Sequence, residues 1–353
     1  MKKVLLLVSL FMMIFTVSYA GVEVPETVRI KLNDGSIIEL DLDEYLYGVV
    51  SSEMGTSYRD DVEVKQVGIE ALKAQAVASR TYAVYKIESN KYDGYDMTAT
   101  TSDQVYKAGT VKDIVKDAVD ATSGQVMTYD NEIICAYFFS TSGGATEEPQ
   151  NVWSATLPYL KTVDDPYEPY IAGKSEWEAR IPAGKYGEIE ILERTDTDRV
   201  YKLKVGNEIY TKNNIRMELG ASLIKSTWFD VEYDENTDEY VFSGRGFGHG
   251  VGMSQHGAMG MAEAGFNYQE ILEWYYNDIE LEPNGDQYII VDDKQDIEDE
   301  EGNELQVNDK NVNKVNKDYS NSKVEIDGNK IMIEKGPMLK KLLEVIENIS
   351  SWR

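Results

Sequence analysis

The sequence predicts an α+β fold with a mixed, mostly antiparallel sheet, one long helix and several short helices. Two observations carry this prediction. Segments that alternate polar and apolar residues, as strands do, are mixed with segments whose apolar residues recur every three or four positions, as in helices. The order of these segments lacks the regular strand–helix–strand spacing of a parallel α/β fold. Two lobes around a groove are one arrangement that satisfies this pattern.

The first predicted elements follow from turn signals and from periodicity. Val28–Leu32 and Ile37–Leu40 flank an Asp-Gly turn and predict a β-hairpin. A short helix is expected at Asp43–Tyr47. From Glu63 to Ser89 the three-and-four spacing predicts a long helix, whose alanines permit close packing. Ile133–Phe139 is an apolar run that predicts a buried strand.

The next predicted elements are strands and then a pair of helices. The strands are expected at Ile189–Leu192, Val200–Val205, Phe229–Tyr233 and Tyr240–Ser243. The helices are expected at Ser254–Ala264, which Gly265 ends, and at Tyr268–Tyr276. Asn267 is placed to cap the second helix, with Glu270 completing a capping box.

Beyond Pro283 the composition changes. Residues 283–323 are rich in acidic and polar side chains and predict a solvated linker. Residues 324–353 predict a small appendage, with a hairpin around Asp327-Gly328 and an amphipathic helix at Met338–Ile349. The chain between 24 and 282 is therefore expected to hold the main domain.

The N-terminus has the pattern of an export signal. Met1-Lys2-Lys3 is basic, Val4–Val17 is almost wholly apolar, and Ser18–Ala20 offers the small residues that signal peptidase prefers. The apolar run is shorter than the roughly 20 residues that span a bilayer, which favours a cleaved signal peptide (1–20) over a retained membrane anchor. We expect an exported protein, either anchored to the membrane or secreted to the cell wall or the intermembrane space.

Composition and charge narrow the range of partners. The 353 residues include 63 acidic and 35 basic side chains, a net charge of -28, which argues against nucleic acid and anionic lipid as partners. A single cysteine, Cys135, rules out an intramolecular disulfide and is expected to be a buried apolar thiol. Two histidines leave little material for a zinc site.

Glu53 is the first candidate for chemistry. It lies in the segment Ser51–Gly55, close to Tyr45 and Tyr47. A glutamate held among tyrosines and a methionine loses hydration, which raises its pKa and suits a general acid at neutral pH. The alternative is an ordinary solvated glutamate at a helix end, of which an acidic chain has many.

The second candidate is the glycine-rich segment Gly244–Gly252, followed by Met253–Gly257. Glycine at every second position lets a ligand or another backbone approach closely. The spacing is neither the dinucleotide fingerprint nor a phosphate loop. His249 and His256 are candidates for metal binding, but two neutral ligands without a third favour histidines that pack or form hydrogen bonds.

The third candidate is the hydroxyl-rich turn Ser140–Gly144. Its hydroxyls and backbone amides could bind sugar hydroxyls or stabilise developing charge. A serine nucleophile would need His249 or His256 as its base, and the chain has no nucleophile-elbow motif. An ordinary capped turn is the alternative.

Taken together, these segments resemble the family of stage II sporulation protein D and the LytB amidase enhancer. The resemblance lies in Ser51–Met54, Ala71–Tyr82, Asp103–Tyr106, Ala136–Gly144 and Gly244–Gly257, in the family's order. It covers about residues 24–282. The resemblance implies a lytic transglycosylase that cleaves peptidoglycan glycan strands, preferably strands without stem peptides, during engulfment in sporulation. It implies glycan strands, an amidase and other engulfment proteins as partners.

The resemblance also assigns roles to residues. It implies that Glu53 is the catalytic acid and that other residues line or support the glycan groove: Gln75, Arg80, Ser140, Thr141, Ser142, His249, Gln255 and His256. Some members bind zinc through a histidine and a cysteine where this chain has Phe139 and Ser142. We therefore expect no metal site and no cofactor.

The chemistry of one carboxyl group fits that activity. Ordinary glycosidases need two carboxylates, whereas a lytic transglycosylase can use one group first as acid and then as base. Three alternatives stay open at this point: a non-catalytic, glycan-binding enhancer of an amidase, a metal-dependent hydrolase, and an envelope adaptor that acts through the acidic tail.

Overall fold

The computed structural model describes residues 22, 24–54, 62–153, 155–169 and 173–282, together with the backbone of short strands between 289 and 335. The side chains of 62–67 and of the residues beyond 282 are not described. The expected leader (1–20) and the expected helix Met338–Ile349 lie outside the described residues. No helix in the described part of the chain is long and apolar enough to cross a membrane.

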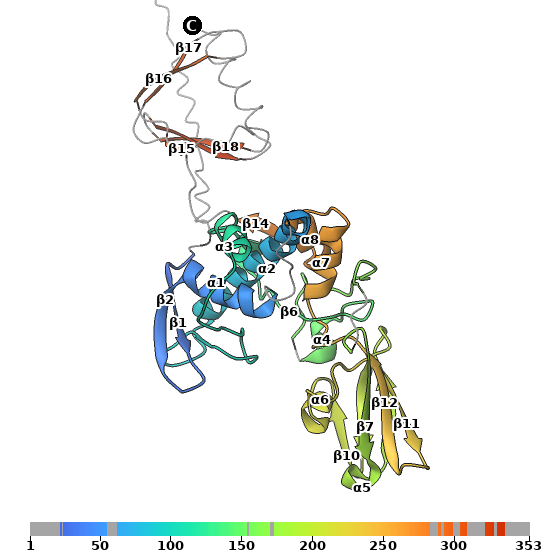
Figure 1. The fold of residues 1–353 in the computed structure, drawn as a ribbon. Coiled ribbons are helices and arrows are strands. Elements are labelled where there is room, and N and C mark those ends of the chain that lie inside the picture. Colours follow the sequence, from blue (N-terminus) through green and yellow to red (C-terminus); the bar gives the residue numbers. More distant parts are fainter. Residues whose placement is uncertain are drawn as a thin grey trace, which may run out of the picture.

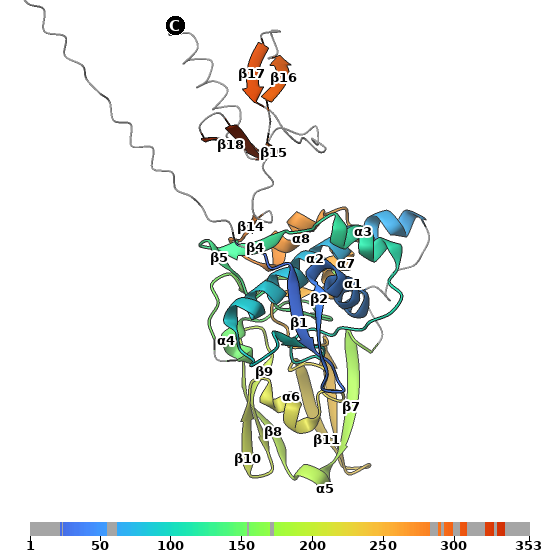
Figure 2. The same cartoon turned by 90° about the vertical axis from the view of Figure 1, so that its left-hand side faces the viewer.

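Up to residue 282 the chain folds into two lobes with separate cores (Figures 1 and 2). The helical lobe comprises residues 24–54, 62–153, 155–169 and 246–282. The sheet lobe comprises residues 173–245 and is inserted between two parts of the helical lobe. The predicted α+β class is confirmed, since most strand pairs are antiparallel and helices pack beside them.

The helical lobe is built around one long central helix, α2 (Val62–Ser89), which contacts α1, α3, α7 and α8. Its alanines Ala71, Ala74 and Ala78 are fully buried, so their small side chains do permit the close packing. The other helices of the lobe are α1 (Leu42–Glu53), α3 (Asp113–Asp120), α4 (Pro149–Val152), α7 (Gln255–Glu263) and α8 (Tyr268–Tyr275).

Three small sheets complete the helical lobe. One has the order β2-β1-β3, one β14-β4-β5, and the third is the parallel pair β6–β13. The strands are β1 (Thr27–Lys31), β2 (Ile37–Asp41), β3 (Met97–Thr98), β4 (Val126–Tyr129), β5 (Glu132–Ile133), β6 (Phe138–Phe139), β13 (Met253–Ser254) and β14 (Glu280–Glu282). The predicted hairpin is β1–β2, and the predicted capping box of Asn267 and Glu270 starts α8.

Helix α1 is longer than predicted. Asp41 caps it, because its Oδ1 accepts the backbone N–H groups of Asp43 and Glu44 at 2.9 and 3.1 Å. The helix then continues to Glu53, since Val49 and Val50 are fully buried in the lobe's core and hold its second half. The last residue of α1 is therefore Glu53, the first candidate for chemistry.

The sheet lobe holds two three-stranded antiparallel sheets that share one core. The first has the order β10-β9-β8 and the second β11-β12-β7. Their elements are β7 (Glu176–Pro182), α5 (Ala183–Tyr186), β8 (Ile189–Arg194), β9 (Val200–Val205), β10 (Glu208–Thr211), α6 (Asn214–Leu219), β11 (Phe229–Asp234) and β12 (Glu239–Arg245). The predicted strands correspond to β8, β9, β11 and β12, whereas β7 and β10 were not predicted.

Arg199 joins the two lobes. Its fully desolvated guanidinium donates from Nη2 to the carbonyl oxygens of Ser142 and Ala145, both at 2.9 Å. Burial lowers the pKa of Arg199 to about 10, so the group keeps its charge at neutral pH. Glu147 adds a second link by accepting a hydrogen bond from Thr195 Oγ1 at 2.7 Å.

One predicted strand needs correction. The expected strand Ile133–Phe139 is interrupted after Ile133, because Cys135 N–H donates to Tyr159 Oη at 3.0 Å and Tyr137 N–H to the carbonyl of Cys135 at 2.9 Å. Those groups cannot join a strand ladder. The expected linker contains strands β15 (Ile289–Ile290), β16 (Asp293–Glu298) and β17 (Glu304–Asn308). The predicted hairpin near Asp327 is present as β18 (Ser322–Asp327) and β19 (Lys330–Lys335).

At Gly48, helix α1 lies against Tyr106, the residue that follows Val105. A Cβ there would lie 2.4 Å from Cε2 of Tyr106. We expect Gly48→Ala to lower the free energy of unfolding by about 1–3 kcal/mol, because the Tyr106 ring must shift in a packed core. Urea denaturation measures this. Gly184→Ala is the matched control, since no atom lies within 4 Å of its added Cβ; equal losses in both variants would contradict the packing argument.

Candidate functional site

Glu53 is half-buried and both of its carboxylate oxygens accept hydrogen bonds. Oε1 accepts the backbone N–H of Val105 at 3.1 Å, and Oε2 accepts Nε2 of Gln255 at 3.0 Å. Desolvation raises the pKa of Glu53, while the two donors pull it back down. Its position as the last residue of α1 adds the negative end of the helix dipole, which also disfavours the charge. The arrangement is not that of a solvated helix-end glutamate.

Gln255 is held in place by a relay of side chains from α2. Gln75 Oε1 lies 3.4 Å from Gln255 Nε2, and Gln75 Nε2 donates to Ser79 Oγ at 2.9 Å. Gln75 and Ser79 are fully buried, one helical turn apart on α2. The structure therefore brings Gln75 to the site as a support for Gln255, and in this conformation Gln75 has no surface to offer a glycan.

The carboxylate of Glu168 connects the hydroxyl turn to the start of α7. Its oxygens accept the backbone N–H groups of Ser142 at 2.5 Å and Gly143 at 3.0 Å, and the hydroxyl of Ser254 at 2.9 Å. Ser254 is the N-cap of α7, with its Oγ accepting the N–H of Gly257 at 3.1 Å. Because Gln255 is the first residue of that helix, Glu168 helps to fix the donor that faces Glu53.

Asp165 lies beside this carboxylate and is almost wholly buried. Its Oδ1 accepts the hydroxyl of Tyr275 at 2.9 Å. Burial, and then the charge of Glu168, raise the pKa of Asp165 to about 6. A side chain at position 257 would clash with it, because a Cβ there would lie 2.3 Å from Asp165 Oδ2. Gly257 therefore serves tight packing.

The hydroxyl turn is less open than the sequence suggests. Thr141 and Ser142 are buried, and Glu168 already occupies the amides of Ser142 and Gly143. The expectation that Thr141 and Ser142 touch a glycan directly does not match their burial, and the capped-turn interpretation fits better. Ser140 is partly exposed, and its contact with glycan stays a prediction.

Arg80 contacts the start of α1 and the C-terminal end of α3. It is fully buried, and its guanidinium donates to the carbonyl of Thr122 at 2.7 Å and to Asp43 Oδ1 at 2.9 Å. Burial lowers its pKa, and Asp43 opposes that shift. Because Arg80 is fully buried, it does not line a groove in this conformation: it holds α3 and α1 against α2, and its role as a support of the glycan groove stays a prediction.

The two histidines are held neutral by their surroundings. Burial lowers the pKa of His249 to about 3, its ring lies among Tyr137, Phe139 and Trp153, and its Nδ1 accepts the N–H of Val251 at 3.1 Å. Burial also lowers the pKa of His256, whose Nδ1 lies 2.8 Å from the carbonyl oxygen of Ser140. These contacts favour packing and hydrogen bonding over metal binding.

The donor set for zinc does not fit. Within the described ranges, no three side chains of His, Cys, Asp or Glu gather in a way that could hold a metal ion. The positions at which the resemblance implies zinc ligands in some members carry Phe139 and Ser142, and these side chains are not ordinary zinc ligands. Cys135 is buried as predicted, and burial raises its thiol pKa to about 11.

Several residues of the site carry no sequence signal that we recognised. Glu168 and Asp165 stand in an irregular loop, and Val105 contributes only its backbone N–H. The Asp103–Tyr106 segment is one of those that resemble the family, and it is the sequence signal that points to Val105. No local pattern marks Glu168, because its partners lie 25 to 86 positions away in the chain.

Comparison with known proteins places the chain in a family. The family model described as "Stage II sporulation protein" matches residues 33–129, and one described as "Domain of unknown function (DUF8618)" matches residues 110–252. The chain is 33% identical to stage II sporulation protein D of Bacillus subtilis over 273 residues, which cover 70% of this chain and 76% of that protein. The chain belongs to the stage II sporulation protein D family.

Other relatives are similar over comparable lengths. Stage II sporulation protein D of Bacillus amyloliquefaciens is 33% identical over 288 residues, which cover 73% of this chain and 79% of that protein. The amidase enhancer of Bacillus subtilis is 29% identical over 293 residues, which cover 65% of this chain and 39% of the enhancer. The region matched by the stage II sporulation protein model includes Glu53 and Gln75, whereas the turn Ser140–Gly144 lies in the region matched by the model described as DUF8618.

The hydrogen bond from Gln255 should control the acidity of Glu53. Replacing Gln255 with leucine removes a donor that favours the carboxylate, so we expect Gln255→Leu to raise the pKa of Glu53 further. The measurement is an NMR titration of the labelled glutamate carboxyl carbon. Gln269→Leu changes an exposed glutamine on α8 and is the control. An unchanged or lower pKa in Gln255→Leu would contradict the assigned contact.

Asp165 should make stability depend on pH. Its folded pKa of about 6 lies above the unfolded value, so the folded state binds the proton more tightly and stability falls as the pH rises from about 4 past 6. We expect Asp165→Asn to be more stable than wild type at pH 8, by about 1–3 kcal/mol, and equally stable at pH 4. Urea midpoints at both pH values test this. The exposed neighbour substitution Asp164→Asn should show neither effect.

Proposed function

We propose that this protein is a lytic transglycosylase that cleaves peptidoglycan glycan strands, preferably strands without stem peptides, and leaves 1,6-anhydro-muramyl ends. Its setting would be the remodelling of the cell wall in sporulation and engulfment. Membership of the stage II sporulation protein D family supports this setting. Glu53 supports the chemistry.

The observation that carries the proposal is the environment of the Glu53 carboxyl. Desolvation raises its pKa, which increases the protonated fraction near neutral pH. The two donors, Val105 N–H and Gln255 Nε2, are uncharged, so they stabilise a carboxylate without locking it in the charged form. The group can hold a proton and can also exist without it, which an acid that later becomes a base requires.

The reaction divides into two steps at this carboxyl. In the first, protonated Glu53 gives its proton to the glycosidic oxygen between N-acetylmuramic acid and N-acetylglucosamine, and the C1–O bond breaks. In the second, the Glu53 carboxylate takes the proton of the muramyl 6-hydroxyl, whose oxygen bonds to C1 and closes the anhydro ring. The proton returns to Glu53 and no water is consumed.

Hydrolysis fits this site less well. A hydrolase that works with two carboxylates needs a second free group as nucleophile or base. In the described part of the chain, Glu168 and Asp165 are two carboxyl groups at the start of α7, the helix that carries Gln255. Glu168 accepts three hydrogen bonds and Asp165 accepts one from Tyr275, so each carboxyl group is already engaged in hydrogen bonds within the protein.

A non-catalytic role as the enhancer of an amidase is the second candidate. The similarity to the amidase enhancer of Bacillus subtilis favours it. In this role the same surface would bind glycan strands and present them to a peptidoglycan amidase, and Glu53 would only bind. The two candidates predict different products.

Location and partners follow from the substrate. We propose that the chain is exported through its N-terminal segment, Met1–Ala20, and works outside the cytoplasmic membrane, where peptidoglycan lies. An amidase that removes stem peptides would supply strands of the preferred kind. Such an enzyme and other engulfment proteins are therefore the proposed partners.

Product analysis tests the proposal. Purified protein is incubated with denuded glycan strands, and the ends are analysed by mass spectrometry. We expect wild type to form anhydro-muramyl ends and Glu53→Gln to form them about 10²–10⁴-fold more slowly, because the amide can neither give nor take the proton. Binding of the strands should persist in the variant.

The matched control is Glu44→Gln, since Glu44 is an exposed glutamate on the same helix, α1. It should cleave like wild type. Intact strands with wild-type protein, together with stimulation of an added amidase, would support the enhancer role instead. Wild-type turnover by Glu53→Gln would remove Glu53 from the mechanism.

A further inference from the structure

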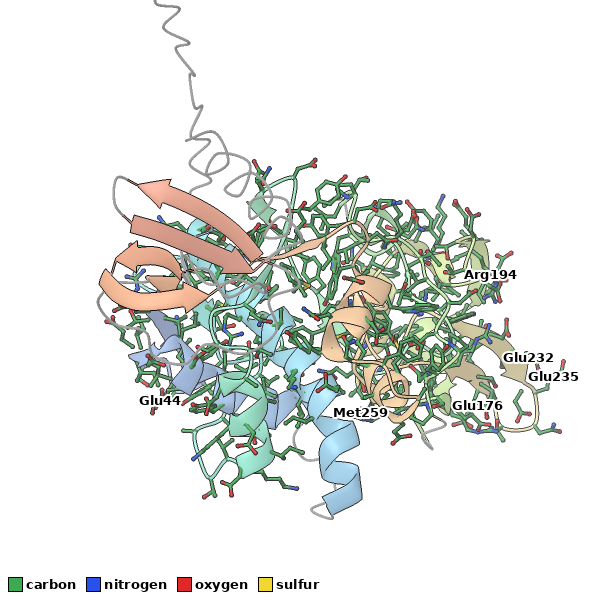
Figure 3. All side chains as sticks on the ribbon, turned by 90° about the horizontal axis from the view of Figure 1, so that it is seen from above. Glu44, Glu176, Arg194, Glu232, Glu235 and Met259 are labelled. Atoms are coloured by element: carbon green, nitrogen blue, oxygen red, sulfur yellow. The ribbon has the colours of Figure 1, made fainter. Side chains whose placement is uncertain are left out.

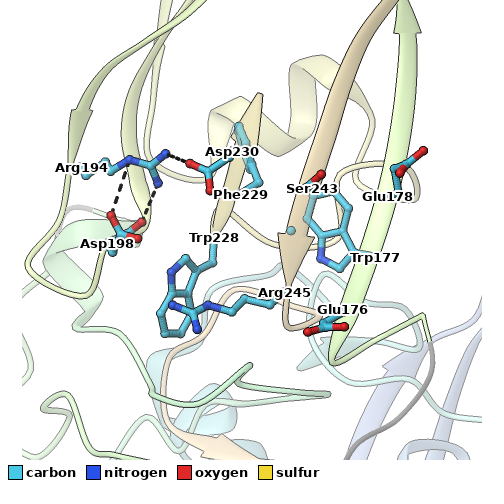
Figure 4. A pocket seen from close by; sticks show the side chains of 11 residues that line it. Glu176, Trp177, Glu178, Arg194, Asp198, Trp228, Phe229, Asp230, Ser243 and Arg245 are labelled. Atoms are coloured by element: carbon cyan, nitrogen blue, oxygen red, sulfur yellow. Dashed lines mark hydrogen bonds and ion pairs between the residues drawn. The ribbon is translucent and has the colours of Figure 1, made fainter. Parts of the chain in front are cut away.

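A cleft of about 520 Å³ lies on the sheet lobe at the end of β12, and Glu53 is not among its lining residues (Figure 4). Trp177, Trp228 and Gly244 line it together with charged side chains at its edges. The volume is within the range of sites that hold small ligands. The hydroxyl turn runs close by, because a Cβ on Gly143 would lie 3.2 Å from Cγ of Arg245.

Arg245 is the cation of this cleft that has no anionic partner. Its guanidinium carbon lies 3.6 Å from the ring centroid of Trp228, so the group is held against the indole (Figure 4). The backbone of Arg245 is fixed as well, since its N–H donates to the carbonyl of Trp228 at 2.9 Å. Within the described ranges, no carboxylate pairs with the Arg245 guanidinium, and the residue is exposed.

The other arginine of the cleft is different. Arg194 Nη2 donates to Asp230 Oδ1 at 2.6 Å, and Arg194 Nη1 donates to the carbonyl of Asp198 at 2.8 Å. Glu178 at the rim is paired with Arg180, at 2.9 Å. Glu176 stands opposite Arg245 in the β12–β7 pair and is exposed to solvent. Arg245 is thus the guanidinium in the cleft that keeps its donors available.

The strongly negative charge of the whole protein bears on what the Arg245 guanidinium can bind. The chain carries a net charge of -28, and acidic side chains such as Glu176, Glu232 and Glu235 stand on the surface of the sheet lobe (Figure 3). An acidic ligand is repelled by such a field, so it needs a local cation to bind. An arginine that stacks on an indole presents its planar fork to a carboxylate without losing much conformational freedom.

We propose that this cleft binds a sugar that carries a carboxylate, with Arg245 as the residue that receives that carboxylate. The inference rests on the proposed function for the nature of the ligand, a peptidoglycan glycan strand. On such a strand the free carboxylate is the lactyl group of N-acetylmuramic acid. An attached stem peptide converts that group to an amide and removes its charge. Arg245 therefore distinguishes strands without stem peptides from strands that carry them.

Binding, measured without turnover, tests this inference. The Glu53→Gln protein is titrated by calorimetry with denuded glycan strands and with the same strands after their lactyl carboxylates are converted to methylamides. We expect the carboxylate strands to bind about tenfold more tightly, as a charge-assisted hydrogen-bond pair predicts. Adding Arg245→Gln should abolish this preference, and Arg245→Lys should keep part of it.

Arg180→Gln is the matched control, because Arg180 is an exposed arginine of β7 that is paired with Glu178 and lies outside the cleft. It should keep the full preference. Equal binding of both kinds of strand by the parent protein, an unchanged preference in Arg245→Gln, or no binding at all would each overturn the inference. Failure of the proposed function would appear in a different experiment, as missing anhydro-muramyl ends with wild-type protein. The binding assay does not use wild-type protein or depend on those ends.

Discussion

The hydrogen bonds of the Glu168 carboxylate are the interaction on which the rest of the site depends. A carboxylate satisfied by two backbone amides and one hydroxyl is a strong and directional link. It joins three segments of the helical lobe. These are the hydroxyl turn, the loop that holds Glu168 just before the sheet lobe, and the first turn of α7. Gln255 extends from α7 to Glu53, so the position of the acid's neutral donor is set by a carboxylate that never touches the acid.

Burial shifts the pKa of the acidic and basic groups around the site in opposite directions. Glu53 and Asp165 lose hydration without gaining a cation, and their pKa values rise. Arg199 loses hydration as well, yet it stays charged at neutral pH and donates hydrogen bonds to the carbonyl oxygens of Ser142 and Ala145. One buried cation thus links the lobes, while the pKa values of the two buried carboxyl groups are raised. The difference arises because the ordinary pKa of arginine lies far above neutral pH, so that burial lowers it only to about 10.

Local signals in the sequence predicted the elements that depend on local physics. The Asp-Gly hairpin, the long alanine-rich helix and the capping box at Asn267 all follow from a few neighbouring residues. Strand β7 was missed, although Glu176–Ile181 alternates polar and apolar residues and does alternate exposed and buried side chains. The sequence marked Gln75 and Arg80 as residues of interest, but it did not predict which groups surround them. A sequence does not show which neighbour a polar side chain on a central helix will face.

The insertion of the sheet lobe has a consequence for how the protein reaches its native state. The parallel pair of β6 and β13 joins Phe138 to Met253, and Gln255 meets Glu53 across 202 positions of the chain. Contacts so distant along the chain form slowly and late. A polypeptide still emerging from a ribosome or a translocation channel therefore lacks the carboxamide beside its acid until almost all of the domain has appeared. A half-made chain cannot assemble this centre.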